Sequence, residues 1–261
     1  MKDNNELYKI INEAIINLQN KSISFKDFLD VQAKFYKYST ANAILIASQM
    51  PKATLIKDSL AWERESIKIS KKAKPIYILE PVFDGEKEIM DYHSKEMYDI
   101  SQTNAKNKKT KYDNRTLLKA FLHNNLAEIK AVDGFDDSNL NASHETVGDN
   151  KNIIYIRRGM DYNMIFKSLA FELARLEYTS SYDKEMDNFK VTSIAYILCK
   201  IHDLDVSSYS FDELPKTFIN NSSIEARKDL VEIKNIVNKI NEGIDEYLQR
   251  VTINRSRGYS R

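Results

Sequence analysis

The sequence contains few of the residues that break or cross-link a polypeptide chain. Its 261 residues include 6 glycines, 4 prolines and a single cysteine, Cys199. One cysteine excludes an intramolecular disulfide framework and is typical of proteins that work in a reducing compartment. The scarcity of glycine and proline favours helices over long flexible linkers. These absences predict a helix-rich protein whose stability comes from its hydrophobic core.

Long apolar runs and a large net charge are lacking as well. No run approaches the roughly 18 apolar residues of a membrane span, and the chain does not begin with an apolar segment of signal-peptide type. We therefore expect a cytoplasmic protein without a membrane partner. Lys and Arg number 39 against 38 Asp and Glu, so any nucleic-acid binding must come from local basic patches.

The spacing of apolar residues in the first half predicts helices followed by a small sheet. Residues 4–20 have helical periodicity, and Ser24 and Ser39 are placed to cap two further helices. The composition changes at Ala53, where short β-branched and aromatic segments begin, and Asp84–Gly85 predicts a turn between two of them. The expected strands of this antiparallel sheet are residues 54–56, 74–79, 88–92 and 98–100.

A polar stretch, residues 104–114, separates this region from a mostly helical second half. We predict an α+β protein with a first domain at 1–110, a second at 115–250 and a basic tail at 251–261. In the second half, the pattern predicts an acidic loop and a strand, followed by three helices. These segments are 133–149 for the loop, 152–156 for the strand, and 166–178, 191–201 and 223–248 for the helices.

The helix predicted at 166–178 contains a pattern related to a zinc-protease motif. Such a helix carries His-Glu-x-x-His, because residues i and i+4 share a face and can ligate one metal. Here Phe171 and Arg175 occupy the two histidine positions, and only Glu172 is kept. Phenylalanine has no donor atom and arginine stays protonated. We expect Phe171 to fill the space of the metal, and Glu172 to pair with Arg175 or another internal cation.

The remaining residues supply no obvious metal site. The four histidines are scattered and no pair has ligand spacing: they are His93, His123, His144 and His202. We therefore predict no catalytic zinc, no other cofactor and no enzymatic activity. Without a metal, Glu172 has no activated water on which to act as a general base.

Two segments interleave cations with aromatic residues, as single-strand-binding proteins do. Cations follow the phosphates, and flat side chains stack on unpaired bases. The alternative is that the aromatic residues belong to the core and the lysines only face solvent. The residues concerned are Lys34, Tyr36, Lys37 and Tyr38, then Trp62, Arg64, Lys71, Lys72 and Lys74.

Several segments resemble the ArdC-type antirestriction proteins and the LtrC-like proteins of conjugative elements. They are Phe35-Tyr-Lys-Tyr-Ser-Thr-Ala-Asn42, Gln49-Met-Pro-Lys-Ala-Thr54, Lys71-Lys-Ala-Lys-Pro-Ile-Tyr-Ile-Leu-Glu-Pro81 and Tyr98-Asp-Ile-Ser-Gln-Thr103, with Ser193-Ile-Ala-Tyr196 later in the chain. The resemblance implies an N-terminal single-stranded-DNA-binding domain followed by a zincin-like metallopeptidase domain. It also adds Asn42 to the expected DNA contacts, and it implies a third metal ligand shortly before Ser193, where the sequence Asn188–Thr192 has no carboxylate.

The sequence thus predicts a sequence-tolerant DNA-binding protein of a mobile element, with a preference for single strands and an inactive zincin-like domain. A host or conjugation protein is a further expected partner. Two alternatives come from other classes of function. One is a protein-binding, antirestriction-like module, and the other is a metallopeptidase with a rearranged metal site.

Overall fold

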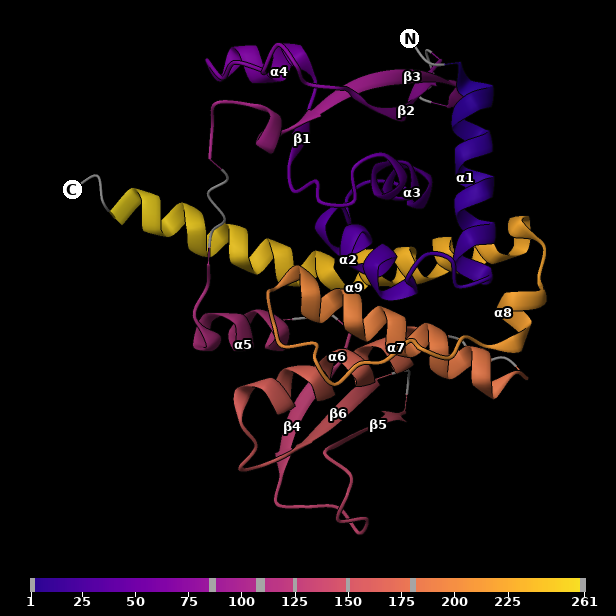
Figure 1. Ribbon diagram of the computed structural model, residues 1–261. Coiled ribbons are helices and arrows are strands. Elements are labelled where there is room, and N and C mark those ends of the chain that lie inside the picture. The colour runs from indigo at the N-terminus through magenta and orange to yellow at the C-terminus, as the bar shows by residue number, and fades with distance from the viewer. Residues whose placement is uncertain are drawn as a thin grey trace. The chain divides into compact units, whose positions relative to one another are not determined.

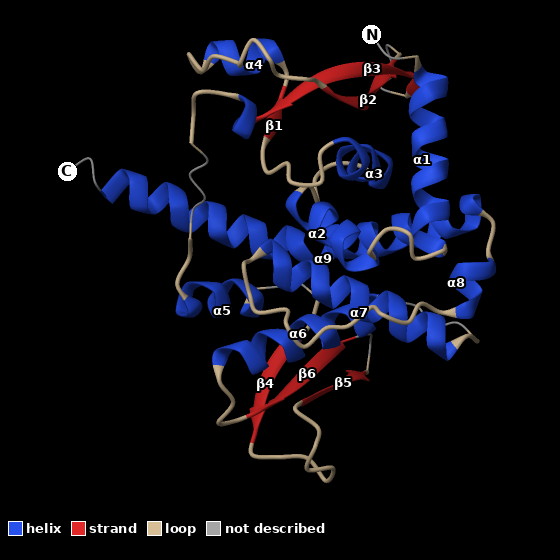
Figure 2. Cartoon of the chain, viewed as in Figure 1, coloured by secondary structure: helices blue, strands red, loops and turns tan. Residues whose placement is uncertain are grey.

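A computed structural model describes residues 3–84, 88–106, 111–123, 126–148, 151–178 and 182–258 (Figure 1). These residues form helices and two three-stranded sheets joined by loops, which confirms the predicted α+β class (Figure 2). The chain divides into two compact units. Unit 1 comprises Met1–Thr110 and Lys216–Val231, and unit 2 comprises Lys111–Pro215 and Glu232–Arg261.

The first helices of unit 1 begin where the sequence places their caps. The Ser24 and Ser39 hydroxyls each accept a hydrogen bond, at 3.2 Å, from a backbone N–H in the first turn, as N-cap residues do. A short helix at Ser59–Arg64 was not predicted. The helices are α1 (Asn4–Gln19), α2 (Phe25–Lys34), α3 (Thr40–Gln49) and α4 (Ser59–Arg64).

The sheet of unit 1 is antiparallel and has the strand order β1-β3-β2. The segments 88–92 and 98–100, which the sequence pattern predicts as two strands, belong to one long strand and the turn that follows it. Gly85 of the predicted hairpin turn lies outside the described residues. The elements are β1 (Ile56–Lys57), β2 (Ile76–Phe83), β3 (Ile89–Asp99) and a 3-10 turn, η1 (Ile100–Gln102).

Two side-chain amides of α3 bond to the main chain of the edge strand β2. The Asn42 amide donates to the Leu79 carbonyl at 2.9 Å, and its oxygen accepts from the Leu79 N–H at 2.8 Å. Gln49 forms the same pair of hydrogen bonds with the main chain of Tyr77, at 2.8 and 3.0 Å. Because the two strand residues are two apart, they direct their main-chain groups to the same side. The amides therefore satisfy polar groups that an edge strand otherwise leaves unpaired.

Asp99, at the end of β3, is a fully buried carboxylate. It accepts hydrogen bonds from the N–H groups of Thr54, Leu55 and Ser101, at 2.6 to 2.9 Å. Burial raises the pKa of Asp99, but these hydrogen bonds lower it by more, so the net shift is downward. The carboxylate thus links the segment after α3 to the end of the sheet.

A segment far along the chain completes unit 1. The Gln19 amide donates to the carbonyls of Phe218 and Asn221, both at 2.8 Å, and the Phe218 ring packs edge-on against Phe25 with centroids 5.7 Å apart. From the sequence, these residues were expected within the second domain, 115–250. A fragment ending near residue 110 would therefore lack part of the core of unit 1. This segment contains α8 (Lys216–Asn220) and the start of α9 (Ser223–Gly258).

Unit 2 places helices against a mixed sheet of order β4-β6-β5. Strand β4 is parallel to β6, and β5 is antiparallel to it. Helix α6 lies across the sheet and α7 packs against α6 (Figure 1). The elements are α5 (Asn114–Leu122), β4 (Glu128–Val132), β5 (Ala142–Val147), β6 (Lys151–Arg157), α6 (Tyr162–Glu177) and α7 (Lys184–Ile201).

Strand β5 corrects the loop predicted at 133–149. Only Ala142 of its six residues is buried, so the segment has no alternation of apolar and polar side chains from which a strand could be predicted. The segment predicted as a basic tail, residues 251–261, is helical as far as Gly258, because α9 continues into it. The side chains of its arginines lie outside the described part of the structure. None of the described helices is long and apolar enough to cross a membrane.

Candidate functional site

Helix α6 carries the degenerate motif on a face that turns into the interior. Its N-cap is Asp161, whose carboxylate accepts from the Met164 N–H at 2.9 Å. The helix buries Phe166, Leu169, Ala170, Leu173 and Ala174 at helical spacing, as predicted. Glu172 lies on the same buried face, with 4% of its surface exposed. A carboxylate in this position needs charged or hydrogen-bonding partners.

Two side chains from different elements are placed around the Glu172 carboxylate. The Arg175 guanidinium lies 3.7 Å from one oxygen, which confirms the expected pairing. The other oxygen is 2.5 Å from Nδ1 of His144, on the edge strand β5. His144 was not predicted as a partner, because it lies 28 residues away in a stretch expected to be a loop. Nothing in the local pattern around His144 could have indicated this contact.

Phe171 does not fill the interior as expected. Its side chain is half-buried and forms part of the wall of a pocket, and the Arg175 guanidinium carbon lies 5.8 Å from the ring centroid. Such a distance is in the range of cation–π contacts. Phe171 thus helps to hold Arg175 at the surface of the pocket.

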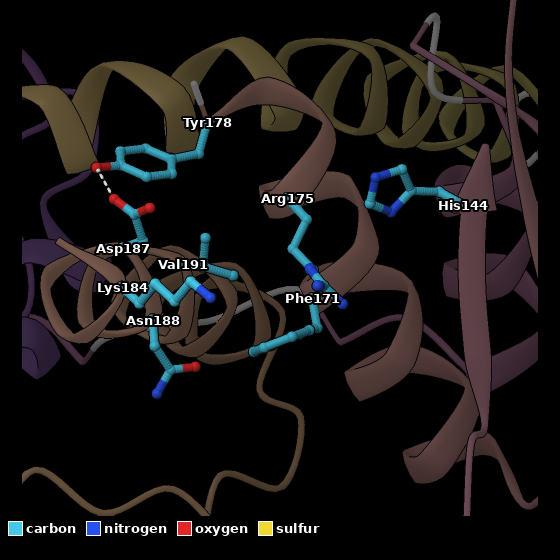
Figure 3. Close-up of a pocket in the computed structure, with 8 residues that line it drawn as sticks. All are labelled: His144, Phe171, Arg175, Tyr178, Lys184, Asp187, Asn188 and Val191. Carbon is cyan, nitrogen blue, oxygen red and sulfur yellow. Dashed lines mark hydrogen bonds between the residues drawn. The ribbon is translucent and has the colours of Figure 1, made fainter. Parts of the chain in front are cut away.

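The pocket lies between β5, α6 and α7 and encloses about 490 Å³ (Figure 3). Tyr178 donates a hydrogen bond to the Asp187 carboxylate at 3.0 Å across one end of it. Burial, followed by this hydrogen bond, raises the pKa of Tyr178 to about 12, so the phenol stays protonated. The pocket is lined by His144, Phe171, Arg175, Tyr178, Lys184, Asp187, Asn188 and Val191.

The residues of this pocket do not fit a catalytic metal ion. No three His, Cys, Asp or Glu side chains among the described residues are grouped as metal ligands would be. His144 and Glu172 are engaged with each other, and the Asp187 carboxylate accepts a hydrogen bond from Tyr178. A catalytic zinc needs three protein ligands and an open position for water or substrate. The donor set of this pocket does not meet that requirement.

Cys199 is unsuited to act as a catalytic nucleophile. It is completely buried in α7, and burial raises its pKa to about 11. A thiol with such a pKa carries almost no thiolate at neutral pH, and the thiolate is the nucleophile.

In unit 1, the structure leaves all the predicted cationic DNA contacts at the surface. Tyr36 and Tyr38 are half-buried. The Lys37 ammonium lies 5.4 Å from the centre of the Tyr36 ring, whereas Tyr38 packs edge-on against Phe35. The exposed residues are Lys34, Lys37, Arg64, Lys71, Lys72 and Lys74.

Both groups of lysines flank the same hydrophobic cluster. Phe35, between Lys34 and Lys37, and Ile76, two residues after Lys74, are buried in that cluster. The two sequence segments are therefore joined through a common core. Whether these side chains contact DNA stays a prediction.

Trp62 and Asn42 are better explained as core residues than as DNA contacts. Trp62 is 1% exposed, and its indole N–H donates to the Tyr98 carbonyl at 2.9 Å. A ring without an open face cannot stack on a base. Trp62 therefore belongs to the core, which is the alternative that the sequence left open. The Asn42 amide is occupied by the main chain of Leu79. We remove both residues from the candidate interface.

No protein-family model and no curated protein matches the chain. Two solved structures of the antirestriction protein ArdC from plasmid R388 are similar to it. The Mn(II)-bound structure has a TM-score of 0.50 and 13% identity, over 91% of this chain and 97% of that one. The metal-free structure has a TM-score of 0.44 and 14% identity, over 80% and 86%. The Mn(II)-bound structure shows that the fold of this chain is that of ArdC, as the resemblance in its sequence implies.

Proposed function

We propose that this protein is an antirestriction-like protein of a mobile element, and that unit 1 binds single-stranded DNA without sequence preference. The observation that carries this proposal is the set of exposed lysines flanking one hydrophobic cluster, with the half-buried Tyr36 among them. The ArdC-like fold supports it, because the similar protein is described as antirestriction.

In this proposal the lysines supply affinity through phosphate contacts. Lys71, Lys72 and Lys74 lie within four residues of one another before β2, and Lys34 is the last residue of α2, with Lys37 in the turn that follows. Each phosphate that a lysine neutralises releases counterions from the strand. Tyr36 is the aromatic residue best placed to stack on a base, which contributes about 1–3 kcal/mol in proteins of this type.

Unit 2 is proposed to have no metallopeptidase activity. A metallopeptidase activates water on a metal held by three side chains. In this chain Phe171 and Arg175 stand at two of those positions, and Glu172 is engaged by His144. The glutamate therefore serves the internal ion-pair network instead of a bound water.

The experiment is a binding titration of the full-length protein with labelled single- and double-stranded oligonucleotides over a salt series. Replacing Lys71, Lys72 and Lys74 together by Gln should weaken binding to all sequences about equally. Each phosphate contact on a single strand contributes about 0.7 to the log–log salt slope, so the slope should fall by about 2. The matched control replaces Lys9, Lys216 and Lys228, three exposed lysines of the same unit, and should leave the slope unchanged.

A protein-binding module is the second candidate, and exposed apolar side chains on the β2–β3 hairpin favour it. Val82, Phe83, Ile89 and Met90 are 40%, 56%, 52% and 69% exposed. If the folded protein fails to bind any oligonucleotide at low salt, the DNA-binding proposal is wrong and this candidate replaces it.

A further inference from the structure

We propose that the pocket between β5, α6 and α7 binds a phosphate group. Arg175 contributes a guanidinium from α6, and Lys184 an ammonium from α7. Two cations thus face the cavity, against the single carboxylate of Asp187, which already accepts from Tyr178. The family resemblance implies a metal site at the positions of Phe171 and Arg175, and neither it nor the DNA interface of unit 1 assigns a phosphate site to this pocket.

Arg175 has hydrogen-bonding capacity left for a ligand. Its nearest carboxylate oxygen, on Glu172, is 3.7 Å away, which is longer than a hydrogen bond. Its side chain is 52% exposed, while the Phe171 ring supports one side of the guanidinium. A guanidinium has five N–H donors in a fork that matches two oxygens of a phosphate. Arg175 is therefore held in place without being saturated.

Lys184 and Asn188 complete the opposite wall. They are four residues apart on α7 and so share one face of that helix. Lys184 is exposed, and no described residue forms an ion pair with it. Figure 3 shows it on the α7 side of the pocket, with Arg175 and Phe171 across from it on α6. A phosphate between the helices could accept from the guanidinium and the ammonium together.

The size of the pocket determines which sources of phosphate are possible. A cavity of about 490 Å³ lies in the range of small-molecule sites, about 300–1,000 Å³, and exceeds what one inorganic phosphate needs. The apolar walls formed by Phe171 and Val191 could cover the organic part of an ester. Free phosphate and a phosphate ester such as a nucleotide share the same anchoring chemistry.

The test uses the full-length, ¹⁵N-labelled protein and follows the Arg175 side-chain Nε–H resonance. Separate titrations add inorganic phosphate, deoxythymidine 5′-monophosphate, and sodium chloride at matched ionic strength. We expect a saturable shift with phosphate or the nucleotide and none with chloride. The ratio of the two affinities identifies the source, because tighter binding of the nucleotide shows that the apolar walls contribute.

The variants separate a built site from general charge attraction. Arg175→Lys keeps the charge but loses the fork, and should bind more weakly than the wild type; because this variant lacks the Arg175 probe, its binding is followed on the side-chain amide resonances of Asn188. Lys184→Gln should weaken binding at least about tenfold, since one charge-assisted hydrogen bond is lost. In Lys184→Gln the Arg175 resonance still reports binding. Lys119→Gln removes an exposed lysine of the same unit and should have no effect.

A wild-type response that does not saturate, or that equals the response to chloride, overturns the inference. Binding that Lys184→Gln and Lys119→Gln reduce equally also overturns it. Lys184 is an exposed residue without an ion-pair partner among the described residues, so its replacement leaves the fold intact. Circular dichroism of each variant checks this. DNA binding by unit 1 can fail without affecting any of these results.

Discussion

Replacing His144 should destabilise the protein more than neutralising the glutamate it contacts. The Glu172 side chain is 5% exposed, whereas His144 and Arg175 are 27% and 52% exposed. His144→Ala therefore leaves a buried carboxylate whose one remaining partner, the Arg175 guanidinium, is 3.7 Å away. Removing one partner of a buried pair costs about 3–5 kcal/mol, and the remaining attraction of Arg175 places this case near the lower end.

Glu172→Gln should lower the free energy of unfolding by less than His144→Ala does. It removes the buried charge but keeps an oxygen that can accept a hydrogen bond from His144, and the side chains of His144 and Arg175 are partly exposed and can reach solvent. We expect a loss of about 1 kcal/mol, typical of one weakened hydrogen bond. In the double variant, the cost of His144→Ala should fall to about the same value, because no buried charge remains to be stranded.

Urea unfolding at neutral pH, followed by circular dichroism, measures these differences. The matched control is His93→Ala, because His93 pairs with Glu80 at 3.1 Å while both side chains are well exposed. Exposed pairs contribute about 0–1 kcal/mol, so this variant should unfold like the wild type. The reasoning is refuted if His144→Ala costs less than Glu172→Gln, or if the two costs are simply additive. Affinity for single strands should not change in either variant.

Four further expectations follow from the same structure. Asn42→Ala leaves the buried N–H and carbonyl of Leu79 unpaired, and should lower the free energy of unfolding by about 2 kcal/mol or more in the same assay. Asp99 has a lowered pKa in the folded state. Its contribution to the free energy of unfolding is therefore fully present above the unfolded-state pKa of about 3.9, and it is lost as the pH falls through the folded-state pKa. The stability difference between the wild type and Asp99→Asn should therefore narrow in acid; a constant difference would contradict this assignment. Cys199 should react with iodoacetamide at pH 8 only after unfolding, and rapid labelling of the folded protein, measured by mass spectrometry, would show that it is accessible. Protein purified without added zinc should contain well under one zinc per chain by elemental analysis and cleave no peptide; stoichiometric zinc that resists mild chelation would show that a metal site exists.

The parts of the fold that sequence could predict are those with local periodic signals. The caps Ser24 and Ser39 and the apolar face of α6 each depend on residues within one or two turns. Strand β5 has one buried residue in six, so no alternation indicates it. Short α4 is similar, since six residues are too few to show helical periodicity.

The candidate site was harder to predict because several of its contacts join residues that are far apart in the sequence. Glu172 and Arg175 are three residues apart on one helix, and their pairing follows from helix geometry alone. His144 reaches the same carboxylate from β5, and Lys184 lines the pocket from α7. Sequence also could not distinguish Trp62 from a stacking platform, since tryptophan suits both a core and an interface. Only its burial and its bond to Tyr98 decide between them.

The two amides of α3 have a further consequence for the behaviour of the protein at high concentration. An edge strand with free main-chain groups is a template on which another chain can add a strand, and this leads to aggregation. At Tyr77 and Leu79 the Gln49 and Asn42 side chains already occupy the places that such a strand would take. The opposite edge is formed by β1, which is only two residues long. Helix α3 thus blocks the addition of a strand at Tyr77 and Leu79 on one edge of the sheet. On the other edge, β1 offers only two residues to which a strand could add.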